Sequence, residues 1–401
     1  MTYKDLAPPK PNDARQILTI VGENMPSADK PSILHPLVGA NVRTAISHWR
    51  HNRPFPLRSL HIRGIAAALI ALRFPNYQLE HRRFKKRFAT HEPTGGPVFL
   101  VGHWRSGTTH LHNLLSQDPR FGHLTFIQAA LPWDAMGKFK PARPIMSAVM
   151  PETRGMDDVR VSIDTPQEEE MALANMNALS FFNSFYFPKK LIEHYRQGVL
   201  LEGISAKELD DFTATYRYLV KKFSYANDGK LLLLKNPANT ARLHFLKTTF
   251  PNAKFVHIVR NPFEVYASMQ KLWKRLFSAF SLQDYAGIDT HPHTLEIYES
   301  LTKRFLREQP HLPPEDFIEI RFEDLEKNPT GELERVYDQF QLPQKASALE
   351  NIQSYADSLS DFRRSKYKLP QSTIDEIRTR WGFALDRWDY QLPESITPTE
   401  G

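Results

Sequence analysis

The sequence predicts an α/β protein with a mainly parallel central sheet and helices on both faces of that sheet. Four short apolar runs have the composition of buried parallel strands, and they lie at residues 97–101, 231–234, 255–259 and 317–322. Segments with helical periodicity follow them, at residues 108–115, 239–250, 263–276 and 330–340. Because strands that alternate with helices pair in parallel through crossover connections, we expect these strands to form one sheet.

The composition is that of a folded protein that suits an anionic ligand. Charged residues make up 24% and hydrophobic residues 41% of the 401 residues, as in ordinary globular domains. The sequence has 52 Lys and Arg against 45 Asp and Glu, a formal net charge of +7. Aromatic-interleaved basic repeats and zinc-ligand spacings are absent, so we expect no nucleic-acid partner. The lack of cysteine excludes disulfides, thiolate metal sites and a cysteine nucleophile.

The N-terminal part differs from the rest of the chain. We expect a large domain at residues 96–401, preceded by an N-terminal extension at residues 1–95. Within the extension, residues 62–73 are apolar with basic ends and lead into the cationic residues 81–87, which predicts an amphipathic, basic helix. Either this helix packs on the domain with a solvated basic face, or residues 62–87 contact anionic lipid. No secretory signal and no run of roughly 18 to 20 apolar residues is found, so we expect a cytoplasmic protein, membrane-associated under the second interpretation.

A glycine-flanked turn follows the first predicted strand and leads into a helix. Such a turn directs backbone N–H groups and the positive end of the helix dipole to one place, which favours binding of a phosphate or sulfate. The spacing of Gly102 and Gly107 matches a nucleotide-binding Walker loop, but Thr108 and Thr109 stand where that loop continues with lysine. Arg105 supplies a basic group inside the turn instead. This difference argues against an ATPase and leaves a kinase or NTPase with an altered loop as an alternative.

The stretch Val-Gly-His-Trp-Arg-Ser-Gly-Thr-Thr resembles the 5′-phosphosulfate loop of sulfotransferases, which use 3′-phosphoadenylyl sulfate (PAPS), in the branch with Arg-Ser-Gly-Thr-Thr. The resemblance covers about residues 97–390 and implies the P-loop-like sulfotransferase fold, with residues 96–401 as the catalytic domain. It also implies that the loop binds PAPS. The loop residues are His103, Trp104, Arg105, Ser106, Gly107, Thr108 and Thr109. Of these, His103 and Trp104 depart from the commoner family pattern Gly-x-Pro-Arg.

A second motif resembles the family's 3′-phosphate signature. Arg260 ends the predicted strand at residues 255–259, and Ser268 lies eight residues later in the following helix. An arginine fork and a hydroxyl donor would together select the extra phosphate that distinguishes PAPS from ATP. The resemblance further implies a basic C-terminal loop that closes over the nucleotide, with Arg364, Lys366 and Tyr367 as candidate contacts. The alternative for that basic run is a solvated charge cluster.

Lys235 ends the apolar strand at residues 231–234, on the edge where open α/β sheets bind ligands. The resemblance implies that Lys235 and Arg105 stabilise charge in the transition state; the alternative is a lysine that only reaches from the strand end to solvent. Residues 165–170, Thr-Pro-Gln-Glu-Glu-Glu, predict a helix with Thr165 as N-cap that continues to about residue 183. A capping box would explain Glu168 on structural grounds. The resemblance instead implies a glutamate general base, either Glu168 or Glu170.

Together these observations predict an enzyme that moves a sulfuryl group from PAPS to an acceptor hydroxyl by in-line transfer. No metal is expected, because cationic side chains and backbone amides neutralise the charge. Aromatic and methionine residues at 121–156 and 181–187 favour a small-molecule or lipid acceptor, such as an apolar alcohol or a phenol. A non-catalytic phosphonucleotide-binding protein is a further alternative, and the sequence indicates no oligomeric state.

Overall fold

The computed structural model describes residues 35–134, 136, 162–359 and 365–400. Its centre is a five-stranded sheet in the order β2-β3-β1-β4-β5, and all four neighbouring pairs are parallel. The strands are β1 (Val98–Val101), β2 (Phe121–Gly122), β3 (Leu231–Lys235), β4 (Lys254–Val259) and β5 (Phe317–Arg321). The predicted α/β class and the four predicted strands are confirmed, whereas the two-residue strand β2 is too short for a sequence pattern.

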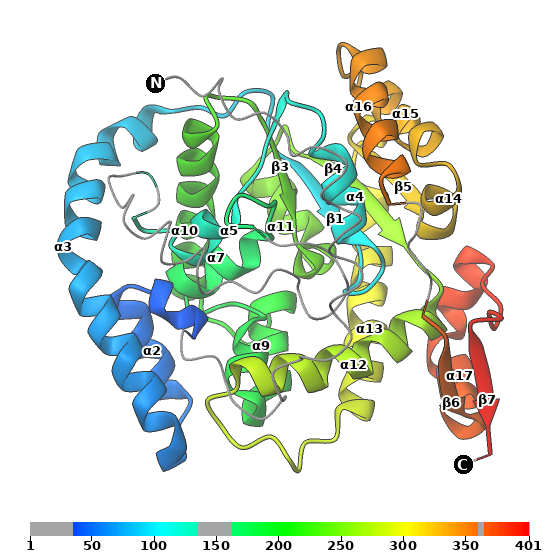
Figure 1. The fold of residues 1–401 in the computed structure, drawn as a ribbon, viewed down its shortest axis with the longest axis horizontal. Helices are drawn as coiled ribbons and strands as arrows, with labels where there is room; N and C mark the ends of the chain where they lie inside the picture. The colour runs from blue at the N-terminus through cyan, green and yellow to red at the C-terminus, as the bar shows by residue number, and fades with distance from the viewer. Residues whose placement is uncertain (1–34, 135, 137–161, 360–364, 401) are drawn as a thin grey trace, which may run out of the picture.

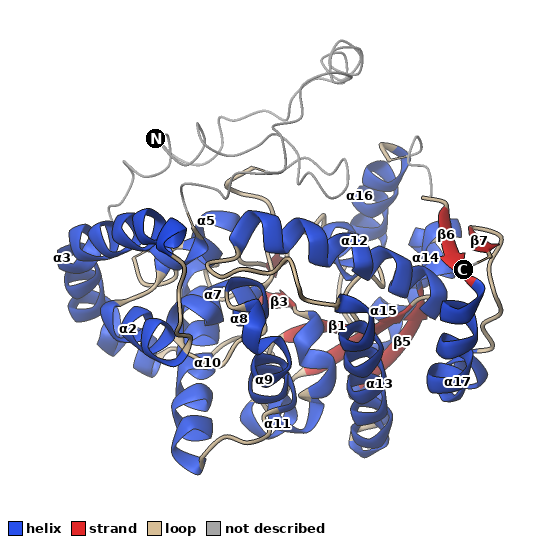
Figure 2. Ribbon diagram, turned by 90° about the horizontal axis from the view of Figure 1, so that it is seen from below, coloured by secondary structure: helices blue, strands red, loops and turns tan. Residues whose placement is uncertain are grey.

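Helices cover both faces of the sheet, as the views in Figures 1 and 2 show. Alternate strand residues point to opposite faces, so Val98 and Leu100 belong to one apolar cluster and Phe99 and Val101 to another. The first cluster includes residues of α4 (Thr108–Leu115), α14 (Phe322–Lys327), α15 (Pro329–Gln339) and α16 (Lys345–Asp357). Burial on both faces explains why the strands are continuously apolar rather than alternating.

The second apolar cluster is larger and contains the helices that surround the candidate site. It draws on α7 (Glu169–Met176), α8 (Asn183–Tyr186), α9 (Leu191–Tyr195), α10 (Ala206–Ala226), α11 (Leu243–Thr249), α12 (Pro262–Phe280), α13 (Thr290–Glu308) and α17 (Gln371–Trp388). The short helix α5 (Phe126–Ala130) lies beside α7. Near the C-terminus, β6 (Tyr367–Pro370) and β7 (Ile396–Thr399) form a separate parallel pair that sequence periodicity did not indicate.

The described part of the N-terminal extension forms α2 (Val42–His51) and the long helix α3 (Leu60–Thr90) at the periphery of the molecule (Figure 1). The inner face of α3 packs on α10, and Lys222 of α10 reaches Glu80 of α3 at 2.5 Å. Both side chains are almost fully buried. Burial lowers the pKa of Lys222, and the Glu80 carboxylate opposes that shift. The predicted basic helix therefore packs on the rest of the chain, and no described helix is long and apolar enough to cross a membrane.

The buried Lys222–Glu80 pair offers a test of how firmly α3 is attached. We expect Lys222→Met to lower the free energy of unfolding by about 3 to 5 kcal/mol, because it leaves the Glu80 carboxylate buried without its cation. Urea denaturation of the full chain measures this loss. Lys221→Met is the matched control, since Lys221 pairs with the exposed Glu92 and its loss should lie within the error of the measurement. Similar small losses in both variants would contradict a firmly packed α3.

Candidate active site

The loop after β1 is constrained by two glycines that no other residue could replace without strain. Gly102 has φ of 149°, and a Cβ there would lie 2.3 Å from the carbonyl oxygen of Ile258 in β4. Gly107 has φ of 94°, and a Cβ there would lie 2.2 Å from the ring of Phe322. The Gly102 N–H donates to Thr240 Oγ1 at 2.7 Å. The loop is thus held between β4, Phe322 and the segment after β3.

The helix that follows the loop begins with an uncapped N-terminus. Gly107 is the N-cap of α4 and supplies no side-chain hydrogen bond to the first-turn N–H groups. Ser106 and Thr108 are buried beside it, and Thr109 is half-buried. The Ser106 N–H donates to the carbonyl of His103 at 3.1 Å. A loop of this geometry directs the first-turn N–H groups of α4 to one place, which favours binding of an anion.

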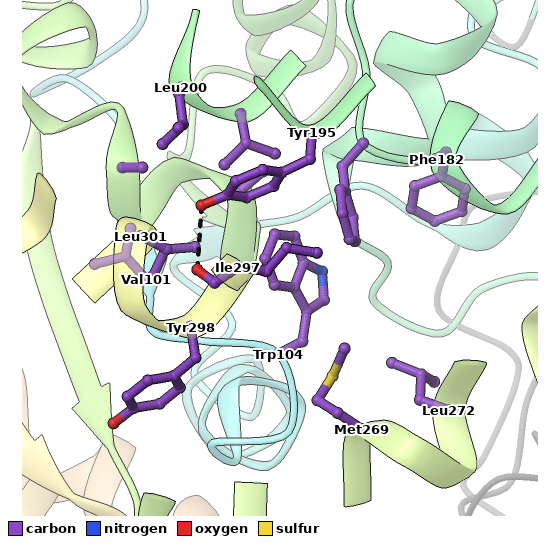
Figure 3. Packing of buried hydrophobic residues seen from close by; sticks show 14 of the residues in the cluster. Val101, Trp104, Phe182, Tyr195, Leu200, Met269, Leu272, Ile297, Tyr298 and Leu301 are labelled. Carbon is purple, nitrogen blue, oxygen red and sulfur yellow. Dashed lines mark hydrogen bonds between the residues drawn. The ribbon is translucent and has the colours of Figure 1, made fainter. Parts of the chain in front are cut away.

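His103 and Trp104, which depart from the commoner family pattern, anchor the loop in the core. The Trp104 ring packs on Phe181 with centroids 4.0 Å apart, and Figure 3 shows Trp104 among buried side chains that include Met269. His103 Nδ1 donates a hydrogen bond of 2.7 Å to the Trp104 carbonyl oxygen. Burial lowers the pKa of His103 to about 4, so its ring is neutral at physiological pH.

The structure brings the two predicted nucleotide motifs together. Arg105, with φ of 72°, donates from Nε to Ser268 Oγ of α12 at 2.8 Å. Arg260 Nη1 donates to the Arg105 carbonyl at 3.4 Å. The Arg260 guanidinium also binds Glu264 at 2.8 Å and lies 4.3 Å above the Phe322 ring. Two cations and a hydroxyl, separated by up to 163 positions in the sequence, therefore meet beside one loop.

A small pocket borders the loop and Arg260. Its lining includes His103 and Ser106 from the loop, Arg260 from the end of β4 and Tyr298 from α13. The Nε2 atom of His103 is buried and has no hydrogen-bond partner among the described residues. The polar lining lies at the carboxyl edge of the sheet, where α/β proteins bind ligands.

Lys235, at the end of β3, forms an ion pair with Glu168. Its Nζ donates to Glu168 Oε2 at 2.8 Å, and the side chains of Lys235 and Glu168 are 3% and 18% exposed. A lysine and a carboxylate thus stand in contact near the carboxyl edge of the sheet, in a site with little water. Such a pair can provide a cation for a developing negative charge and a carboxylate for a proton.

The predicted capping box at Thr165 is wrong. Helix α7 begins at Glu169, and Glu168 is its N-cap without a side-chain capping bond. The preceding residues are extended: Pro166 pairs with Thr125 in an antiparallel bridge, and the Gln167 N–H donates to the Leu124 carbonyl at 2.8 Å. Tertiary backbone pairing outweighs the local helix signal, and α7 ends at Met176 rather than near residue 183.

The neighbouring Glu170 has a different environment from Glu168. It forms a buried ion pair with Arg242, with Nη1 3.1 Å from Oε2. Asn236 Nδ2 donates to the same oxygen at 2.6 Å, and the Phe181 N–H donates to Oε1 at 2.7 Å. Both Glu170 oxygens are committed to internal contacts. The structure therefore separates the two candidate bases: Glu168 contacts Lys235, and Glu170 holds the fold.

Sequence reasoning missed the polar residues that complete this network, Asn236, Asn239 and Arg242. All three are buried and follow β3 in or beside a 3-10 helix, Pro237–Ala241. A signal was present, because Lys-Asn-Pro-Ala-Asn-Thr-Ala-Arg places five polar residues directly after a buried apolar strand. Polar residues in such a position must find partners inside the protein.

The three C-terminal candidates, Arg364, Lys366 and Tyr367, lie in or before β6 in the sequence. Tyr367 lies in β6, and its ring is 4.3 Å from Lys271 Nζ. Lys271 is on α12, one turn beyond Ser268. Lys366 is exposed, and Arg364 lies outside the described residues. Among the described residues, no group of three or more His, Asp or Glu side chains could hold a metal ion.

Glu169, the third acid of the segment, is fully buried and accepts hydrogen bonds at Oε1 from Tyr216 and Asn239, each at 2.8 Å. Burial raises its pKa from 4.5 to about 7. The protonated carboxyl therefore contributes stability that is complete below pH 4.5 and is lost as the pH rises through about 7.

We expect Glu169→Gln to flatten the pH dependence of unfolding between pH 4.5 and about 7. The affected free energy is on the order of 3 kcal/mol, because the neutral amide keeps the shape of the carboxyl without its ionisation. Denaturant midpoints across this pH range measure it. Glu350→Gln, at an exposed position of α16, is the control for loss of one carboxylate. An unchanged pH profile in Glu169→Gln would show that another group titrates.

Comparisons with known proteins show which family the chain resembles. A model of the sulfotransferase family matches residues 97–346. Omega-hydroxy-beta-dihydromenaquinone-9 sulfotransferase Stf3 from Mycobacterium bovis, and its counterpart from Mycobacterium tuberculosis, are 30% identical to this chain over 331 residues, which is 79% of this chain and 82% of each relative.

Two solved structures share the fold. Sulfotransferase STF9 from Mycobacterium avium has a TM-score of 0.67 at 16% identity, covering 87% of this chain and 90% of its own. Sulfotransferase STF1 from Mycobacterium tuberculosis has a TM-score of 0.59 at 17% identity, with coverage of 85% and 90%. The region matched by the family model runs from β1 through β5 and includes both predicted nucleotide motifs, Lys235 and the glutamates. The chain therefore belongs to the sulfotransferase family and is an enzyme of that kind.

Proposed function

We propose that this sulfotransferase uses PAPS and transfers its sulfuryl group to the hydroxyl of an apolar, lipid-like alcohol. The observation that carries the proposal is the Lys235–Glu168 ion pair, which lies at a strand end of the same sheet edge as the loop and its Arg105–Ser268 contact. One sheet edge thus presents anion-binding groups, a cation for the reacting oxygen and a carboxylate.

The residues present fit a ligand with two anionic ends. Arg260 and Ser268 would hold the 3′-phosphate, and the loop amides with Thr108 and Thr109 would hold the 5′-phosphosulfate. The remaining loop residues would form the walls of the nucleotide site. Tyr367 and Lys366 would cover the nucleotide from the C-terminal side. The fit is supported by the uncapped start of α4 and by the short distance between the two motifs. Bound PAPS supplies an activated sulfuryl group.

Glu168 and Lys235 would perform the proton and charge chemistry. Glu168 would take the proton of the acceptor hydroxyl while that oxygen bonds to sulfur. As the bond from sulfur to the bridging phosphate oxygen breaks, its electron pair stays on that oxygen, and Lys235 and Arg105 would stabilise the charge. The proposal needs no metal ion, because these cations and the loop amides neutralise the phosphosulfate. Glu170 would keep α7 in place through Arg242 rather than move a proton.

An apolar acceptor is supported by the relatives and by the residues beside the site. The relatives at 30% identity are named for a hydroxylated menaquinone derivative, a lipid-like alcohol. In this chain Phe181, Phe182 and Phe185 are buried directly beyond α7, and Phe181 packs against Trp104 of the loop. Such an acceptor resides in a membrane, so the proposal includes a cytoplasmic enzyme with peripheral membrane contact through residues 62–87.

The two glutamates give a test of the proposed base. We expect Glu168→Gln to lower the rate of sulfuryl transfer from labelled PAPS to a lipid alcohol at least about 100-fold. Glu170→Gln should instead lower the free energy of unfolding by about 3 kcal/mol, because Arg242 loses its buried partner. Turnover and denaturant unfolding are measured on both variants. A fully active Glu168→Gln enzyme would overturn the assignment of the base.

The 3′-phosphate site is tested by binding rather than by turnover. We expect Ser268→Ala to weaken binding of adenosine 3′,5′-bisphosphate about tenfold or more, since one hydrogen bond to a charged phosphate is lost. Binding of adenosine 5′-phosphate, which lacks the 3′-phosphate, should be unchanged. Isothermal titration of both nucleotides into the parent protein and Ser268→Ala measures these affinities. Equal weakening for the two ligands would place Ser268 away from the 3′-phosphate.

A further inference from the structure

The outward face of α3 is apolar over the first two thirds of the helix. The inward face is marked by buried residues such as Ile62, Ala66 and Ile70. Most exposed residues about half a turn away are small or apolar, and His61 is the polar exception. The small or apolar residues are Leu60, Gly64, Ala67, Ala68, Ala71, Leu72, Pro75 and Leu79. The charged residues of this segment, Arg63 and Arg73, do not lie on that face, because Arg73 is buried and Arg63 stacks on Phe55.

The leucines of this face are exposed to an unusual extent. Leu60 is 59%, Leu72 is 74% and Leu79 is 66% exposed, and Leu57 just before the helix is 88% exposed. Of the nine large hydrophobic residues that are exposed in the described part of the chain, seven lie between residues 42 and 79. Single exposed leucines are ordinary on protein surfaces. A group of them on one helix face indicates a surface that binds a partner.

The same helix ends in a cluster of cations. The exposed basic residues of its last two turns are Arg82, Arg83, Lys85, Lys86 and Arg87. None of them forms an ion pair with another described residue. Arg82 and Lys86 follow Leu79 at spacings of three and seven residues, so they continue the apolar face along the helix. The only acidic residue of α3 is Glu80, which is buried against Lys222.

We propose that this surface, which we call the outer face of α3 (Leu60 to Lys86), lies in the plane of an anionic lipid bilayer. The 31-residue helix is about 46 Å long. Its leucines would enter the boundary between headgroups and acyl chains, and its cations would contact lipid phosphates. The helix lies at the periphery of the molecule, where a flat surface can reach it (Figures 1 and 2). This inference deepens the proposed function by assigning the lipid surface that its acceptor requires, yet lipid binding is measurable without any transfer.

Charge complementarity favours lipid over a second copy of the chain. An antiparallel pair of α3 helices would place the cations of each helix on the apolar residues of the other. A parallel pair would place cations on cations. Neither arrangement offers an acidic residue, because the outer face has none. An anionic bilayer offers acyl chains to the apolar part of the face and phosphates to its basic part.

The test is flotation of the full-length protein with vesicles of phosphatidylcholine alone or mixed with phosphatidylglycerol. We expect binding to the mixed vesicles, weakened by added salt. The double variant Arg82→Glu/Lys86→Glu should lower the partition coefficient roughly 30-fold or more, because two attractive charges are lost and two repulsive ones are introduced. Leu72→Ser/Leu79→Ser should lower it to a similar degree by removing apolar contact. All four positions are exposed, so the variants should melt at the temperature of the parent protein.

Lys207→Glu and Leu209→Ser, at exposed positions of α10, are matched controls that should float like the parent protein. Equal binding to both vesicle types, or outer-face variants that still float, would overturn the inference. A dimer seen by sedimentation and abolished by Leu72→Ser/Leu79→Ser would assign the face to a second copy instead. Turnover of a water-soluble alcohol should be unchanged in the outer-face variants. Absence of transfer in every protein, with flotation as expected, would count against the proposed function and leave the docking surface standing.

Discussion

The buried ion pair between Glu170 and Arg242 holds the arrangement of the candidate active site. Glu170 is on the first turn of α7, and Arg242 follows β3 by only seven residues. Because each of these ions would be costly to bury alone, the pair ties the start of α7 to the end of β3. Asn236 and the Phe181 N–H satisfy the remaining hydrogen-bonding positions of the carboxylate. Because α7 and β3 are tied together, Lys235 Nζ is held 2.8 Å from Glu168 Oε2.

A second constraint comes from the close packing around the loop. Gly107 has no room for a side chain because the Phe322 ring lies against it, and the Arg260 guanidinium lies 4.3 Å from the centre of the same ring. Phe322 is the first residue of α14, directly after β5. One ring therefore orients the loop after β1 and the Arg260 side chain. Steric exclusion and cation–π contact act together here, although the residues come from three separate strand ends.

The long helix α3 has two faces with opposite chemistry. Its inner face carries Glu80, which is paired with Lys222 and attaches the helix to α10. Its outer face is apolar and then basic, without an acidic residue. The sequence left two interpretations open for this segment, packing on the domain or contact with lipid. Because the two properties occupy different faces of one helix, they are compatible, and the buried pair holds the outer face toward solvent.

The sequence alone determined much of this protein. Continuous apolar runs predicted the parallel strands, and the glycine-flanked turn with Arg105, followed by Arg260 and Ser268, predicted two anion-binding motifs in the right order. The strand prediction succeeded because it depends on residues that are close together in the chain, whereas anion binding by the two motifs stays a prediction. Strand β2 escaped detection because it has only two residues, and β6 and β7 escaped because each has only one buried residue and contains proline, unlike the continuously apolar β1.

Only the tertiary structure distinguished Glu168 from Glu170. The local pattern at Thr165 favoured a capping box, and that prediction failed because residues 163–167 pair with residues 124–127 instead. It is this extended pairing that lets Glu168 reach Lys235 while Glu170 turns to Arg242. The choice depends on partners 66 to 72 residues away. A sequence pattern describes the neighbours of a carboxylate along the chain, whereas its role is set by the charges that folding brings to it.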